Sequence, residues 1–524
     1  MIRWPRPERA LVAGKVLSFH EPAETVLPRG VVIGAGRILA LFDPDDRAAR
    51  RDLGVAVEDL GDTVLVPGFI DAHNHLPSAV LDSFAVPTAH VLSNDDLVAA
   101  LAAAVAGLPA DQWVVTEHAL SLQQFPIGDP PSAEVLDRVP GDNPIAVRLG
   151  AHAMVLNGRA MALAGIADHR GDPPGGMIER DPSGRPTGII REYGAIGLVL
   201  RCFDPRAVAG DLSDAIRATQ RDYARTGITT VRVTGFREGE LAAFQGVLAA
   251  DGRLATRVFG GPRLDPTATL ADRLATIASW PAATGFGGEW LAHDAVKIFV
   301  DHGIETIVDG GEPTLLMERE ELLALVARAA GLGWAVTCHA ATRLGVDAVL
   351  DVFERVRRTS TTRLSIEHGF DVSDAQLTRM AAHDIWWSTQ PAVVGVELNA
   401  AATALRRHRL VPLRTALRLG VGCVLGSDWN GTPGRRGRPF QPLESVALSV
   451  ERRSLWGQDF DVEESLPVSA ALHLHTRTAA LMLGRGDLGV IAPGASADLV
   501  GLDADPTATL RPGVRLTLVG GRAV

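Results

Sequence analysis

The sequence predicts an α/β protein: a (β/α)8 barrel of the TIM type with a long insertion after its first strand, and a small β-sandwich built from both termini. Three observations support this. The central part of the chain alternates short apolar runs with amphipathic stretches, as β/α units do. Residues 72–227, between the first two runs, are too many for one loop and one helix. Both ends of the chain alternate apolar and polar residues between turns rich in glycine and proline.

Composition and charge exclude several classes of protein. The 524 residues carry a formal net charge of −11, which argues against nucleic acid or an anionic membrane as a partner. Cys202, Cys338 and Cys423 are too few and too far apart for a disulfide framework or a cysteine-type zinc site. The chain start lacks the apolar core of a signal peptide, and no run reaches the ~18–20 apolar residues of a membrane span. We therefore expect a cytoplasmic protein.

The two ends of the chain are expected to form one β-unit together. Short strand-like runs such as 10–19 and 515–524 are punctuated by turns. Neither end is long enough for a stable β-domain alone, so the two sets should pair. We expect residues 1–63 and 485–524 to form this composite sandwich and residues 64–484 to form the barrel.

Eight apolar runs are the candidate barrel strands. Their near-continuous apolar composition is typical of parallel strands buried on both faces. Helical stretches lie between most of them, for example at 318–333 and 372–384. The predicted strands are 63–71, 228–235, 256–262, 295–301, 334–340, 363–369, 385–391 and 422–428.

The insertion is expected at about residues 85–210. It begins with a helix that Asn94 should cap, and continues with strand, helix and hairpin patterns at 144–166 and 175–192. Loops at the carboxyl ends of barrel strands form the active-site face of this fold. We therefore expect the insertion to cover the active site and to shape the choice of substrate.

The first barrel strand ends in a concentration of titratable residues. His73 and His75, two positions apart on a strand, should point to the same side. Two buried imidazoles without a charged partner are costly, whereas both are well used as ligands of one metal ion. The alternative is a pair of ordinary polar loop histidines.

Other predicted strands also end in residues that are out of place in apolar runs. These residues are Lys297, His339, His368 and Asp428. All four fall at or near the strand ends that should face the active site. Together with the two histidines of the first strand, they form a ligand set of the kind that zinc prefers.

The motifs around these residues resemble those of the amidohydrolase superfamily of metal-dependent hydrolases. The order "PGFIDAHNH", "VKIF", "TCHA", "IEHG" and "GSDW" matches the superfamily's ligand-bearing strand ends, and the divided β-sandwich matches as well. The long insertion makes the chain more similar to the YtcJ-like amidohydrolases, the group that includes N-substituted formamide deformylase. The resemblance covers nearly the whole chain.

The resemblance implies a ligand set for one or two divalent metal ions, most simply Zn²⁺. His73 and His75 would bind the more buried ion with Asp428, and His339 and His368 would bind the second. Lys297 would bridge the two ions if CO₂ carboxylates its amine, since a carbamate offers two oxygens and a negative charge. The alternative for this lysine is a place beside a mononuclear site.

This ligand set predicts a hydrolase for amide-type C–N bonds that are not peptide bonds. Bound metal lowers the pKa of water toward ~7, so that hydroxide can attack the carbonyl. Asp428 would take the proton and deliver it to the leaving nitrogen. A mononuclear deaminase or a lactonase of the same superfamily is a second interpretation. We rank it lower because strand alternation should direct Glu367 away from the active site. A catalytically silent scaffold, the third interpretation, should lack ligands.

Residues that contact substrate are harder to identify. His152 lies in a segment that resembles one in the related group, and would contact the substrate or the oxyanion, although a packing role is an equal alternative. Asn157 should cap the helix that follows it. Gln390, Arg414 and Trp429 are the remaining candidates for substrate contacts. Aromatic residues near the strand ends favour a small apolar or aromatic substrate, and a homodimer is common in the resembling family.

Overall fold

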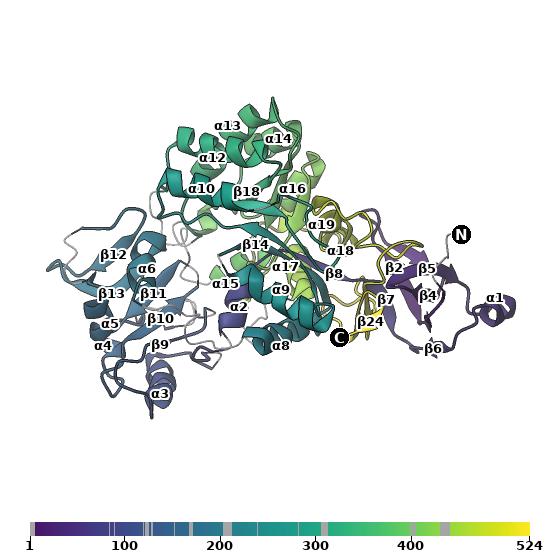
Figure 1. The fold of residues 1–524 in the computed structure, drawn as a ribbon, viewed down its shortest axis with the longest axis horizontal. Helices are drawn as coiled ribbons and strands as arrows, with labels where there is room; N and C mark the ends of the chain where they lie inside the picture. The colour runs from purple at the N-terminus through teal and green to yellow at the C-terminus, as the bar shows by residue number, and fades with distance from the viewer. Residues whose placement is uncertain are drawn as a thin grey trace.

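The computed structural model has three regions, which Figure 1 shows side by side. A sheet with its own helices lies on the left, a helix-covered group of parallel strands in the centre, and the N-terminal strands on the right. The model describes residues 6–524 apart from 83, 89, 119, 121–124, 127–128, 151, 167–170, 203–211, 238, 281, 305–312, 399–401, 403–404 and 430–440.

Two parallel sheets form the central region. The first has the order β16-β15-β14-β8 and the second the order β17-β18-β19-β20-β21. Isolated parallel bridges join the sheets at two places, from Arg263 after β15 to Lys297 of β17, and from Asn74 of β8 to Trp429 after β21. All carboxyl ends therefore face one side. The strands are β8 (Phe69–Asn74), β14 (Ile228–Phe236), β15 (Arg257–Pro262), β16 (Leu291–Ala292), β17 (Ala295–Phe299), β18 (Ala335–Ala340), β19 (Leu364–His368), β20 (Ile385–Thr389) and β21 (Cys423–Leu425).

The predicted first strand, 63–71, is in fact two strands. Strand β7 (Val64–Pro67) pairs with terminal strands, and β8 starts the central sheet after a break at Gly68. A Cβ atom on Gly68 would lie 2.3 Å from Oγ1 of Thr229, so this close crossing requires glycine. After this break, β8 extends to Asn74, beyond the predicted end of the strand at residue 71, and so contains His73.

Helices cover the outside of the central strands (Figure 1). Two of them lie within the ranges predicted from sequence: α12 (Arg319–Gly331) and α14 (Asp374–Ala382). Ser373 and Gln376 form a capping box at the N-terminus of α14. The others are α2 (Leu76–Asp82), α8 (Leu212–Ala224), α9 (Glu240–Asp251), α10 (Leu270–Ser279), α13 (Arg343–Arg357), α15 (Pro391–Glu397), α16 (Leu413–Arg418), α17 (Pro442–Glu451), α18 (Val468–Leu474) and α19 (Arg477–Met482). None of the described helices is both long and apolar enough for a membrane span.

Strands from both ends of the chain share one sheet. Its order is β24-β23-β22-β7-β2-β3, and a second sheet, β5-β4-β1-β6, is entirely N-terminal. One apolar cluster contains Leu11 and Ile33 of the second sheet together with Leu65 and Leu499 of the first. The strands are β1 (Arg9–Val12), β2 (Lys15–Ser18), β3 (Thr25–Leu27), β4 (Gly30–Gly34), β5 (Arg37–Phe42), β6 (Val57–Asp59), β22 (Leu499–Leu502), β23 (Val514–Val519) and β24 (Arg522–Ala523), and a short helix, α1 (Arg47–Asp52), precedes β6.

The segment between β8 and β14 forms a sheet of its own, in the order β12-β13-β11-β10-β9, with two apolar clusters. Ser93, not Asn94, caps its first helix, and Asn157 caps α5 as expected. The expected end of the insertion near residue 210 lies outside the described residues. The elements are α3 (Asn94–Val105), β9 (Val114–Val115), α4 (Ala133–Leu136), β10 (Ile145–Leu149), β11 (Ala153–Leu156), α5 (Gly158–Leu163), β12 (Met177–Arg180), β13 (Pro186–Arg191) and α6 (Glu192–Leu200).

A buried ion pair fixes the central strands to the C-terminal sheet. Arg257 on β15 donates from Nε and Nη2 to the two carboxylate oxygens of Asp498, at 2.8 and 3.0 Å, and its side chain is fully buried. The same carboxylate accepts the backbone N–H of Gly520 at 2.7 Å. Such a two-pronged pair holds the two regions in one fixed geometry.

We predict that Arg257→Met lowers the thermal unfolding midpoint strongly. Removing one partner of a buried pair leaves an uncompensated charge, which costs about 3–5 kcal/mol. Arg257→Met combined with Asp498→Asn should recover part of the loss. Arg29→Met, which removes an exposed arginine paired with exposed Asp45, should change the midpoint little. A midpoint for Arg257→Met equal to that of the control would contradict this role.

Candidate metal centre

Five of the six predicted ligands lie at or just after the carboxyl ends of central strands, and Lys297 lies in the middle of β17. His73 is in β8, Lys297 in β17, His339 in β18 and His368 at the end of β19. His75 directly follows the last residue of β8, and Asp428 lies three residues after β21. Neighbouring parallel strands therefore bring residues that are far apart in the sequence to one place.

Three of these residues form a compact set of ligand atoms. The nearest ligand atoms of His73, His368 and Asp428 all lie within 4.8 Å of one another. Oδ1 of Asp428 is 3.1 Å from Nε2 of His73 and 3.0 Å from Nε2 of His75, and its Oδ2 is 3.7 Å from Nδ1 of His368. One carboxylate thus faces three imidazoles, as in a metal site with mixed nitrogen and oxygen ligands.

The remaining two predicted ligands continue this group. The His339 and His368 ring centroids are 4.4 Å apart, and those of His368 and His73 are 4.8 Å apart. Lys297 is 1 % exposed. Its Nζ has no hydrogen-bond partner in the part of the chain that the structure describes. A buried polar atom without a partner is rare in folded proteins, and this one lies among ligand-type side chains.

Unusual backbone conformations direct these side chains. His368 has φ of 76° and Asp428 has φ of 53°, in the left-handed region that residues other than glycine rarely adopt. Such conformations cost energy and concentrate at functional sites. Between strand β21 and Asp428, Gly426 packs so closely on His73 that an added Cβ would lie 2.5 Å from the histidine Cβ.

Glu367 corrects one expectation. Strand alternation predicted that it points away from the site, but its Oε2 accepts a hydrogen bond from Nδ1 of His73 at 2.6 Å. The left-handed φ of His368 breaks the alternation, so consecutive side chains serve the same site. Arg232 donates to Oε1 of Glu367 at 2.7 Å, and Thr337 donates to the same oxygen. This carboxylate fixes the ring of His73 with Nε2 turned toward Asp428.

Two further side chains support the ligands from behind. Oε1 of Gln390 lies 2.8 Å from Nδ1 of His368, and Gln390 is fully buried. Asp71 accepts hydrogen bonds from the backbone N–H and the hydroxyl of Ser427, at 2.9 and 2.6 Å, directly before Asp428. Gln390, predicted to contact substrate, is therefore placed where it orients a predicted ligand.

The electrostatics suit a metal ion. Burial lowers the pKa of His75 to about 4 and holds the pKa values of His339 and His368 well below the ordinary value, so these rings are neutral. Burial also lowers the pKa of Lys297 to about 8. Although burial raises the pKa of Asp428, charge interaction with His73 and hydrogen bonds from His73 and His75 together hold it well below its ordinary value, so this carboxylate is ionised. Neutral imidazoles and an ionised carboxylate are the forms that bind metal.

His152 reaches the same region from the inserted segment. Its ring centroid is 5.5 Å from that of His339 and 5.2 Å from that of Tyr193. Glu192 accepts a hydrogen bond from Nδ1 of His152 at 2.9 Å, and itself adopts a left-handed φ of 65°. Glu192 also accepts the backbone N–H of Gly303 at 3.3 Å, which ties the insertion to the chain after β17.

The other predicted substrate residues are placed differently. The backbone carbonyl of Trp429 accepts the N–H of His75 at 2.9 Å, and its ring packs against the apolar cluster around β14. The side chain of Arg414 on α16 is exposed and donates to the carbonyl of Glu463 at 3.4 Å. Among the described contacts, none joins Arg414 to the metal-site residues.

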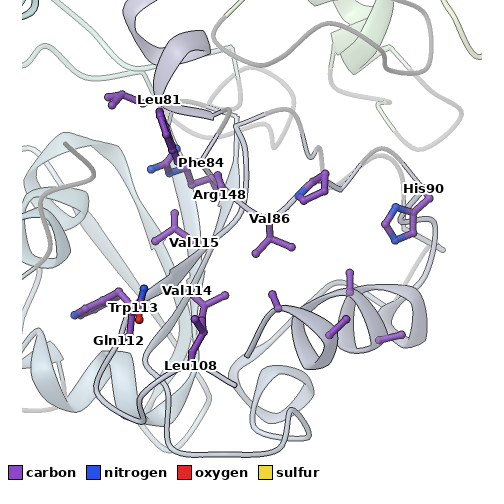
Figure 2. Close-up of a pocket in the computed structure, with 16 residues that line it drawn as sticks. Leu81, Phe84, Val86, His90, Leu108, Gln112, Trp113, Val114, Val115 and Arg148 are labelled. Atoms are coloured by element: carbon purple, nitrogen blue, oxygen red, sulfur yellow. The ribbon is translucent and has the colours of Figure 1, made fainter. Parts of the chain in front are cut away.

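A cavity of about 730 Å³ lies in the inserted segment, apart from the predicted ligands. Figure 2 shows Phe84, Val86, Val114 and Val115 pointing into it from the chain beside α3, with Arg148 at one end. Small alanines of α3 form part of its wall. The guanidinium of Arg148 is already paired with Asp82 at 2.9 Å, and most of the remaining lining is apolar, with His90 and Gln112 as further polar residues.

Sequence reasoning did not find Glu192, Tyr193 and Arg263. Arg263 directly follows β15, and its guanidinium carbon lies 5.1 Å from the ring centroid of Tyr193 and 4.9 Å from that of Phe299. Its position one residue after a predicted strand was the available signal. Nothing in the local pattern links Glu192 or Tyr193 to the strand ends, because they begin helix α6 of the inserted segment.

Comparison with known proteins agrees with this geometry. A family model described as "Amidohydrolase family" matches residues 56–524. The chain is 29% identical over 509 residues to the N-substituted formamide deformylase of Arthrobacter pascens, covering 91% of this chain and 90% of that protein. It is 25% identical over 469 residues to the putative amidohydrolase YtcJ of Bacillus subtilis (strain 168), covering 86% and 85%. An uncharacterized metal-dependent hydrolase from Pyrococcus horikoshii OT3 shares the fold, with a TM-score of 0.72 at 21% identity over 96% of this chain and 98% of that one.

We predict that Gly426→Ala weakens metal binding. The added methyl group must displace His73, and disturbing the support of a ligand costs about 10- to 100-fold in metal affinity. The measurement is a titration of metal-free protein with zinc, followed by calorimetry. Gly246→Ala is the matched control, because Gly246 is an exposed helical glycine with open space around its missing Cβ. Equal affinities in the two variants would contradict the assigned role of His73.

Proposed function

The chain belongs to the amidohydrolase family, and we propose that it hydrolyses an amide-type C–N bond, other than a peptide bond, in a small apolar or aromatic molecule. An N-substituted formamide or an acyl amide is the expected substrate. The observation that carries the proposal is the convergence of His73, His368 and Asp428 within 4.8 Å at the strand ends. A relative named for the deformylation of N-substituted formamides supports the substrate class.

We interpret the two central sheets as one (β/α)8 barrel, because isolated bridges link them at two places. In this interpretation residues 64–484 form the barrel apart from strand β7, which pairs with terminal strands, and about 85–210 form an insertion over the active site. Residues 1–63 and 485–524 form a composite β-sandwich, which the shared sheet and the common apolar cluster support. The free cysteines favour a reducing compartment such as the cytoplasm.

The residues present fit a divalent metal ion, most simply Zn²⁺. His73, His75 and Asp428 would hold one ion, and His339 and His368 a second. Lys297, with its unpartnered amine and lowered pKa, is suited to carboxylation by CO₂ and would then bridge the two. When bound, metal supplies Lewis acidity, which polarises a carbonyl and lowers the pKa of water.

Asp428 is placed to move the proton of the reaction. Water adds its oxygen to the carbonyl carbon, the C–N bond breaks, and the amine leaves with one additional proton. The ionised carboxylate of Asp428 takes that proton from the attacking water and passes it to the leaving nitrogen. His73 and His75, both within 3.1 Å of Oδ1, hold the carboxylate in position.

His152 is assigned to the substrate. Glu192 orients its ring through Nδ1, and the ring lies beside His339. We propose that it contacts the carbonyl oxygen as negative charge develops there. The insertion would in this way complete a site that the barrel strands begin.

A mononuclear deaminase is the second candidate, and one observation disfavours it. Such a role needs a carboxylate free to exchange protons beside the sixth strand. Both oxygens of Glu367 are engaged, one by His73 and the other by Arg232 and Thr337. Glu367 therefore positions His73 in this proposal and carries no proton.

We predict that purified protein hydrolyses N-(2-phenylethyl)formamide and that prolonged chelation abolishes the activity. Zinc with bicarbonate should restore it. Asp428→Asn should lower kcat by about 10²- to 10⁴-fold, since a general acid–base group is lost; the metal content of the variant is measured alongside. Asp52→Asn, at an exposed acid, is the control. Full activity in the chelated protein or in Asp428→Asn would contradict the proposal.

A further inference from the structure

Arg263 lies where the inserted segment meets the central strands. It follows β15 directly, and its backbone forms an isolated parallel β-bridge with Lys297 of the neighbouring strand β17. Its partly buried guanidinium lies over two aromatic rings, that of Tyr193 from the insertion and that of Phe299 from β17. The two rings restrict the position of the cation, and its N–H groups are available for hydrogen bonds with a ligand.

Short ring contacts connect Arg263 to the predicted metal ligands. The Phe299 ring that it covers at 4.9 Å is itself 5.5 Å from the ring of His339. Tyr193, at 5.1 Å, is 5.2 Å from the ring of His152. Arg263 is therefore near enough for one small molecule to reach both it and the reacting carbonyl.

A glycine leaves room for the side chain of Arg263 beside that of Lys297. Gly235 on β14 has φ of 103°, and an added Cβ would lie 2.7 Å from the Cβ of Arg263 and 3.1 Å from that of Lys297. Only glycine permits both long side chains to pass this point.

No described residue forms a hydrogen bond or ion pair with the guanidinium of Arg263. The nearby acids are already engaged elsewhere. Glu192 accepts from His152 and Gly303, and Asp301 accepts from the backbone of Ala341 and Thr342. Glu367 and Asp428 are held by the histidines of the metal site. A partly buried arginine with five donors and no acidic partner is an anion-binding group.

We propose that Arg263 binds a carboxylate of the substrate. This inference rests on the proposed function and narrows it: the substrate is a small amide that carries a carboxylate, such as an N-formyl or other N-acyl derivative of an aromatic amino acid. The guanidinium edge pairs with both carboxylate oxygens. The aromatic side chain of the substrate would share the apolar environment of Phe299 and Tyr193. Hydrolysis would release the free amino acid and the acyl acid.

The test compares two substrates that differ only in the carboxylate. N-formylphenylalanine, used as each enantiomer, is N-(2-phenylethyl)formamide with a carboxylate added. Wild-type protein should prefer the carboxylate substrate in kcat/KM by about 10- to 100-fold, the value of a charged hydrogen-bonded pair. Arg263→Met should remove this preference and keep activity on the neutral amide. Arg263→Lys should keep part of the preference, and Arg328→Met, at an exposed arginine of α12, all of it.

A binding measurement separates this inference from the proposed function. Calorimetry with 3-phenylpropanoate and 3-phenylpropanamide needs no turnover. If wild-type protein binds 3-phenylpropanoate and Arg263→Met does not, the carboxylate site is supported even if neither formamide is hydrolysed. Equal losses on both formamides would overturn the inference, because Arg263 would then serve the metal site, for example by pairing with a carbamate on Lys297. Unchanged preference in Arg263→Met would overturn it as well.

Discussion

The site depends on a chain of buried charges beneath the predicted metal ligands. Arg232, 1 % exposed, donates to Asp294 at 2.6 Å and to Glu367 at 2.7 Å, and Arg363 pairs with the other oxygen of Asp294. Glu367 then accepts from His73. Burying such groups costs several kcal/mol each, which pairing only just offsets. The network is therefore weak evidence for stability, and its clear product is a fixed orientation of the His73 ring.

The same arrangement explains why strained backbone is retained around the site. His368 and Asp428 adopt left-handed conformations that ordinary strands avoid. These conformations allow Glu367 and His368, adjacent in sequence, to serve one site, and they bring Asp428 against His73. The close approach of Gly426 and the glycine crossing at Gly68 fix the same strand. The chain therefore retains backbone conformations of higher energy, and these bring side chains from distant segments together.

Much of this organisation was predictable from sequence, and the exceptions have physical causes. Apolar runs located the strands, and polar residues near their ends pointed to the group of side chains that the structure brings together, because both follow from local pattern. Local pattern did not reveal the division of the first strand, because its two halves pair with different sheets, through contacts between segments far apart in the sequence. It also predicted the wrong direction for the side chain of Glu367, because strand alternation fails at His368, which has a left-handed φ. Sequence reasoning did not identify Arg263 and Glu192, because their contacts arise only where the inserted segment meets the central strands.

The most direct test of the account is the metal content of the chain. Wild-type protein and Lys297→Ala would be produced with zinc and bicarbonate, and metal per chain measured by mass spectrometry. The account predicts about two ions in the wild type, and one or none in the variant that lacks the bridging group. One ion in both proteins would remove Lys297 from the ligand set. No metal in either would contradict the central claim that these strand ends form a metal site.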